Sequence, residues 1–113
     1  MNWGRAIYIF FVLMSLTTTV GFLFDQNSTV LFIATCINII ATLLKLGIKS
    51  TLSTELFISS FVADLHLIPA LILVILDDST LNAALALSIG AVVANIFSIV
   101  ILLIDIIKEQ EEI

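Results

Sequence analysis

The sequence predicts an all-α, polytopic membrane protein with four antiparallel transmembrane helices joined by short loops. Hydrophobic residues make up 61% of the 113 residues, and charged residues only 12%. Soluble domains ordinarily contain about 45–50% apolar and about 25% charged residues. A small domain leaves a large share of its chain exposed, so a soluble fold of this size would not hide that much apolar surface.

A third observation, the spacing of the charges, gives the number of helices. Charged residues divide the chain into four long apolar stretches, of which only the third is interrupted, by Asp64 and His66. A helix needs about 20 apolar residues to cross a bilayer. We therefore expect a single domain, residues 1–113, whose helices cover about residues 6–24, 28–46, 55–76 and 80–107.

The links between these stretches carry helix-capping and helix-ending residues. Asn27 or Ser28 is expected to cap the second helix, and Gly47 to end it. Ser53 or Thr54 is expected to cap the third helix. Because the links are short, helices that follow one another in the chain should pack antiparallel.

The basic residues predict the orientation in the membrane. Four crossings place every basic residue on one side: Arg5, Lys45, Lys49 and Lys108. The other side then holds the acidic residues Asp25, Asp77 and Asp78. Basic residues prefer cytoplasmic loops. We therefore expect both termini in the cytoplasm.

The third helix contains the most informative polar residues, Asp64, His66 and Pro69. Ionisable groups at this depth are costly and are enriched at functional sites. Asp64 and His66 are two positions apart, which places them on different helix faces. Pro69 donates no backbone hydrogen bond and frees the carbonyl of Leu65. One hypothesis is a proton relay or ion-coordinating point; the other is a buried Asp or His that bonds to polar groups on a neighbouring helix and only fixes helix register.

The second helix carries a stripe of polar residues at spacings of three and four: Thr35, Asn38, Thr42 and Lys45. Such a stripe is typical either of a water-filled path or of hydrogen bonds that hold helices together. We favour the second interpretation for the stripe, with Asn38 near the middle of the membrane.

The fourth helix carries small residues at every fourth position: Ala86, Gly90, Ala94 and Ser98. Such a seam lets two helix backbones approach closely. The partner helix could belong to the same chain or to a second copy, and we expect a homo-oligomer. Near the helix ends, Trp3 and Tyr8 are expected in an interfacial aromatic belt, and Asp105 is expected to reach toward water.

The first helix ends in an unusual run: Thr17, Thr18, Thr19, Val20, Gly21 and Phe22. The last four of these residues resemble the filter sequence of potassium channels, whose Thr hydroxyl and backbone carbonyls replace the water shell of the ion. The resemblance ends at Leu23, where that family has a second glycine. The alternative, which we favour, is a helix end whose Thr hydroxyls bond back to helix carbonyls.

The chain also resembles a family of small four-helix bacterial inner-membrane proteins of unknown activity. The resemblance rests on Trp3-Gly4-Arg5, on the Thr-rich run and on the segment from Asp64 to Pro69. The resemblance implies a location in a bacterial inner membrane and no known activity.

Composition excludes several function classes. The sequence has four basic residues against nine acidic ones, which leaves no basic patch for nucleic acid. One cysteine provides no metal cage, and we see no catalytic pair, so we expect no enzyme, cofactor or metal. We favour an oligomeric channel or transporter for a proton or monovalent cation; the alternative is an accessory or assembly subunit of a larger membrane complex.

Overall fold

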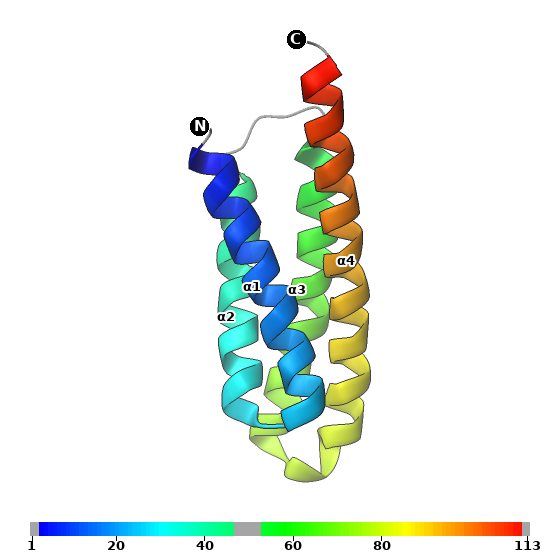
Figure 1. Cartoon of the computed structure of the whole chain (residues 1–113). Coiled ribbons are helices and arrows are strands. Elements are labelled where there is room, and N and C mark those ends of the chain that lie inside the picture. Colours follow the sequence, from blue (N-terminus) through cyan, green and yellow to red (C-terminus); the bar gives the residue numbers. More distant parts are fainter. Residues whose placement is uncertain (1–2, 47–52, 112–113) are drawn as a thin grey trace.

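A computed structural model describes residues 3–46 and 53–111 and gives an all-helical chain (Figure 1). Helix α1 covers Trp3–Asp25, α2 covers Ser28–Lys45, α3 covers Ser53–Leu76 and α4 covers Leu81–Glu111. A short 3-10 turn, η1, covers Asp78–Thr80 between α3 and α4. The four predicted helices are therefore present, and α4 extends beyond its expected end.

The helices lie side by side in an elongated bundle of 53 × 21 × 20 Å. In Figure 1 the chain descends along α1, ascends along α2, descends along α3 and ascends along α4. The first turn of α1 and the last turn of α4 consequently lie at the same end of the bundle. Gly47, expected to end the second helix, lies outside the described residues.

The described loops follow from short-range hydrogen bonds. Asn27 caps α2, because its side-chain oxygen accepts from the Thr29 backbone N–H at 2.9 Å. Gln26 before it has a φ of 58°, which lets the chain leave α1 and turn at once. At the other loop the Ser79 backbone N–H donates to Asp77, and this bond holds the pKa of the Asp77 carboxyl below its usual range.

All four helices are long and apolar enough to cross a membrane. Their outer faces are rich in large apolar side chains; Leu65 of α3 is 54% exposed and Phe97 of α4 is 60% exposed. A bundle with apolar residues all round is typical of a membrane-spanning protein.

The interior of the bundle alternates between apolar and polar layers. One apolar cluster includes Tyr8, Val12 and Leu56, near the end that holds the start of α1. The other includes Phe22 and Leu31, near the α1–α2 loop. Buried polar side chains interrupt and flank these clusters along the chain. Six of them form the candidate site: Ser15, Asn38, Thr42, Ser60, Asp64 and Asn95.

Two expectations about the helix ends are wrong. Tyr8 is 0% exposed, because it lies on the inward face of α1 and bonds to Ser60 of α3. Asp105 is 4% exposed, because it follows the buried face of α4 beyond Ile101 instead of reaching toward water. Trp3, by contrast, is 69% exposed.

Candidate functional site

Asp64 lies at the centre of the polar layer and is only 7% exposed. Its Oδ1 accepts a hydrogen bond from the Asn38 side-chain amide of α2. Its Oδ2 lies 2.6 Å from the Thr42 hydroxyl, also of α2. Both carboxyl oxygens thus have partners from the neighbouring helix, which offsets the cost of burying the group.

The orientation of the Asn38 amide is fixed by two other partners. Its Nδ2 lies 3.3 Å from the Ser60 carbonyl oxygen, which accepts but never donates. Its Oδ1 accepts from the Ser15 hydroxyl of α1 at 2.6 Å. The nitrogen therefore points toward Asp64 and the oxygen toward Ser15.

The network extends to the fourth helix. Asn95 of α4 donates to the Ser15 hydroxyl oxygen at 3.4 Å. The bonds from Asn95 to Ser15, from Ser15 to Asn38 and from Asn38 to Asp64 all run in the same donor direction. We call these residues, together with Thr42 and Ser60, the Asp64 network: it joins all four helices.

The polar stripe predicted on α2 faces the interior throughout. Thr35, Asn38, Thr42 and Lys45 are all buried. The Thr35 hydroxyl donates to the carbonyl of Leu31 on its own helix at 2.8 Å, whereas Asn38 and Thr42 reach Asp64. The two middle residues of the stripe therefore join helices, as the second interpretation expects.

Lys45 ends this stripe in an unusual environment. It is 2% exposed, and its Nζ has no hydrogen-bond partner among the described residues. The ammonium lies over the ring of Tyr8, 5.5 Å from the ring centroid, a distance suited to a cation–π contact. The Tyr8 hydroxyl is in turn 3.2 Å from the Ser60 hydroxyl, beside the Asp64 network.

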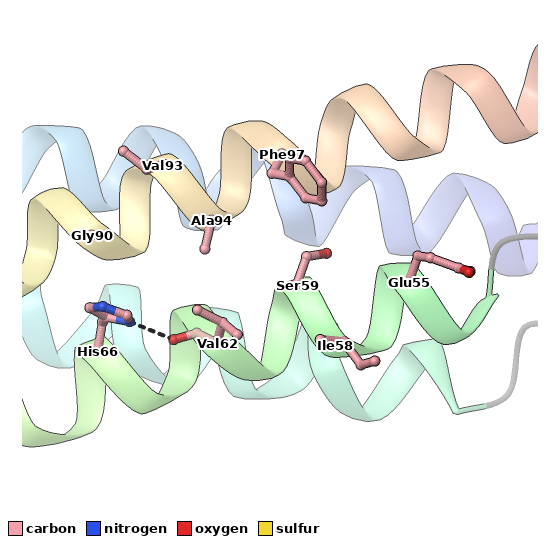
Figure 2. A pocket seen from close by; sticks show the side chains of 9 residues that line it. All are labelled: Glu55, Ile58, Ser59, Val62, His66, Gly90, Val93, Ala94 and Phe97. Atoms are coloured by element: carbon pink, nitrogen blue, oxygen red, sulfur yellow. Dashed lines mark hydrogen bonds between the residues drawn. The ribbon is translucent and has the colours of Figure 1, made fainter.

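His66 lies on another face of α3 and is not part of the Asp64 network. Its Nδ1 lies 2.8 Å from the carbonyl oxygen of Val62, so Nδ1 carries the proton in this bond. The ring borders a groove of about 580 Å³ between α3 and α4 (Figure 2). The groove is lined by Glu55, Ile58, Ser59, Val62, His66, Gly90, Val93, Ala94 and Phe97.

The small-residue seam of α4 meets α3 of the same chain. A Cβ placed on Gly90 would lie 2.8 Å from Nε2 of His66 and still closer to its Cδ2. Further along, the Ser98 and Ser59 hydroxyls are 2.6 Å apart. Ala94 is buried, whereas Ala86 is exposed. The seam therefore has an intramolecular partner at Gly90 and Ser98.

The Thr-rich run lies within the helix α1. The Thr17 and Thr19 hydroxyls bond to carbonyls one turn earlier, those of Leu13 and Ser15, and Thr18 does the same with Met14. These six residues therefore belong to a helix whose carbonyls point along its axis, rather than to an extended filter. Val20 and Phe22 continue this helix, and a Cβ on Gly21 would meet nothing within 4 Å.

Pro69 lies inside α3, which continues through it to Leu76. Its ring is on the exposed side of the helix. The proline therefore faces away from Asp64 and lies outside the network of polar contacts.

Sequence reasoning missed the contributions of α1 and α4. Ser15 belongs to a buried face of α1 that recurs at spacings of four and three: Tyr8, Val12, Ser15, Thr19 and Phe22. This spacing is the signal that would have placed Ser15 inside the bundle. Asn95 is adjacent to the small-residue seam in sequence, and only the rotation of α4 shows that it points inward.

Fold and site together define a class: a four-helix protein with membrane-span helices and a buried polar network around one carboxylate. The chain belongs to the DUF6394 family, a family of unknown function whose model matches residues 25–106. The expected membership of a family of unknown function is thus confirmed; the match includes the segment from Asp64 to Pro69 but not Trp3-Gly4-Arg5. No curated protein and no solved structure matches the chain.

Proposed function

We propose that this protein inserts into a bacterial inner membrane as four antiparallel spans and conducts protons or monovalent cations, with Asp64 as the group that holds the cargo. The observation that carries the proposal is the burial of Asp64 within bonds from a second helix, at the midpoint of a membrane-span helix. Ionisable residues at such positions mark ion and proton pathways in membrane proteins. A homo-oligomer, joined through the exposed apolar faces, is part of this proposal.

The polar interior of α2 supports a route to this group. Thr42 and Lys45 continue from Asp64 toward the end of the bundle where α1 begins. Apolar clusters lie toward both ends of the bundle, with Phe22 and Leu31 toward the α1–α2 loop and Val12 and Leu56 toward the start of α1. Thr42 and Lys45 are the buried polar residues along the proposed route past the second of these clusters.

Asp64→Asn tests the role of the carboxylate. Asparagine keeps the shape and the hydrogen-bonding capacity of the side chain but removes its charge. In liposomes, the proton or cation flux of the purified variant is expected to be at least tenfold lower than that of the wild type. The flux is measured with a pH-sensitive or ion-sensitive dye. The matched control is Asp77→Asn, which removes an exposed carboxylate outside the spans and should keep wild-type flux. Wild-type flux in Asp64→Asn contradicts the role.

The proposed orientation has its own test. Arg5, Lys45 and Lys108 lie toward the end of the bundle that holds the start of α1, whereas Asp25 and Asp77 lie toward the other. The rule that basic residues stay inside then places both termini in the cytoplasm. A reporter that works only in the cytoplasm should be active when it is fused after residue 113. Activity only of a reporter that works in the periplasm contradicts this orientation.

The groove beside His66 favours a second candidate, an accessory subunit of a membrane complex. It lies between α3 and α4, with the apolar side chains of Val93 and Phe97 along it. This function expects no flux from the pure protein and a partner that comigrates in mild detergent. Val93→Trp, which fills the groove, should abolish that comigration, whereas a tryptophan at the exposed Ile40 of α2 should preserve it.

A further inference from the structure

The hydrogen bonds of Asp64 distinguish its two carboxyl oxygens. Oδ1 faces the Nδ2 of Asn38, whose orientation is fixed by the Ser60 carbonyl and the Ser15 hydroxyl. An amide nitrogen donates and does not accept, so Oδ1 remains an acceptor at all times. Only Oδ2 has a neighbour, the Thr42 hydroxyl, that both donates and accepts.

Thr42 has one hydroxyl proton and two possible acceptors. Its Oγ1 lies 2.6 Å from Asp64 Oδ2 and 3.0 Å from the carbonyl oxygen of Asn38, one turn earlier on α2. When Asp64 is ionised, Thr42 donates to Oδ2, and the distance suits a charge-assisted bond. When Oδ2 is protonated, it donates to Oγ1, and Thr42 turns its own proton to the Asn38 carbonyl. Both states leave every donor and acceptor of this group satisfied.

We infer that the cargo held at Asp64 is a proton carried on Oδ2, and that Thr42 is the positioning residue that accommodates its arrival and departure. Binding forms one O–H bond on the carboxylate and breaks one O–H bond of a hydronium ion, which becomes water; release to a water molecule reverses the transfer. Thr42 keeps its own proton throughout. This inference rests on the proposed function only in treating the bound proton as cargo.

The same contacts disfavour a metal cation. Sodium or potassium in a protein needs several oxygen lone pairs directed at it. Around Asp64 the nearest side-chain groups are an amide N–H and a hydroxyl, and the nearby Ser60 carbonyl already accepts from Asn38. Among the described residues, the other buried titratable groups on neighbouring helices are Tyr8 of α1, Lys45 of α2 and Asp105 of α4. Asp105 is a second carboxylate, but it lies ten residues beyond Asn95 on α4, about 15 Å along the helix, and it interacts electrostatically with Lys45.

Infrared difference spectroscopy of the full chain in lipid vesicles tests the inference. A step from high to low pH should produce the C=O stretch of a neutral carboxylic acid, which moves in D2O and is lost in Asp64→Asn. Thr42→Val removes the acceptor of the Oδ2 proton, so this band should move to higher frequency. Thr42→Ser keeps a hydroxyl and should leave the band in its wild-type position.

The possible outcomes distinguish the proton assignment, the role of Thr42 and the transport proposal from one another. An Asp64 band that is lost or moved by sodium at constant pH, or no such band at any pH at which the chain is folded, overturns the proton assignment. An unmoved band in Thr42→Val overturns the role of Thr42. If the band behaves as expected but liposomes show no flux, the transport proposal fails and the proton site stands.

Discussion

Asn38→Leu is expected to lower the free energy of unfolding by about 2–4 kcal/mol, because it leaves buried polar groups without partners. Asp64 Oδ1 loses its donor, and the Ser15 hydroxyl loses its acceptor. The measurement is reversible unfolding in bicelles, followed by circular dichroism.

The chain offers a matched control for this change. Asn82→Leu makes the same substitution at an exposed position of α4 and should change stability by less than about 0.5 kcal/mol. The double variant Asn38→Leu/Asp64→Leu removes both partners and should recover part of the loss. Equal stabilities of Asn38→Leu and Asn82→Leu would show that the network does not hold the helices together.

Gly90→Ala should cost about 1–3 kcal/mol through overpacking, and Gly90→Leu should cost more and separate α3 from α4. The added Cβ of Gly90→Ala meets the His66 ring, which has to rotate and lose its bond to the Val62 carbonyl. Unfolding in bicelles measures the cost, and intramolecular disulfide trapping between α3 and α4 reports their separation.

Two further variants test whether contact with the His66 ring causes the loss of stability in Gly90→Ala. Gly21→Ala lies in α1 where an added Cβ meets nothing within 4 Å, so it should be neutral or stabilising by about 0.5–1 kcal/mol. His66→Ala should restore stability to Gly90→Ala, because it removes the ring that the new methyl group meets. If Gly90→Ala is as stable as Gly21→Ala, the two helices do not approach closely at this point.

The helices could be predicted from sequence because each is a long apolar stretch bounded by charges. The inward stripe of α2 could be predicted as well, since its polar residues recur at helical spacing on an apolar background. For the same reason the seam of α4 was visible at Gly90, although its partner helix was not. Membrane-span length and polar periodicity are local properties, and local properties can be read along the chain.

The contacts between helices could not be predicted in this way. The sequence indicates that a buried Asp64 needs hydrogen-bond partners. That these partners are Asn38 and Thr42 depends on how α2 and α3 are rotated and shifted relative to each other. Tyr8 illustrates the same limit: an aromatic residue near a helix end suits the interface, yet the rotation of α1 buries it against Ser60. Such rotations are set by packing summed over whole helix faces.

The positions of the partners of Asp64 along the chain have a consequence for biogenesis. Both direct partners, Asn38 and Thr42, precede Asp64, as do Ser15 and Ser60 of the Asp64 network, whereas Asn95 follows it. If the spans insert in chain order, as the proposed function implies, a hairpin of α1 and α2 presents the Asn38 amide and the Thr42 hydroxyl when α3 emerges. A lone aspartate at mid-span costs about 2.5–3.5 kcal/mol to insert. Under the proposed membrane insertion, the first two helices are therefore expected to act as an intramolecular template for the third, before the fourth is made.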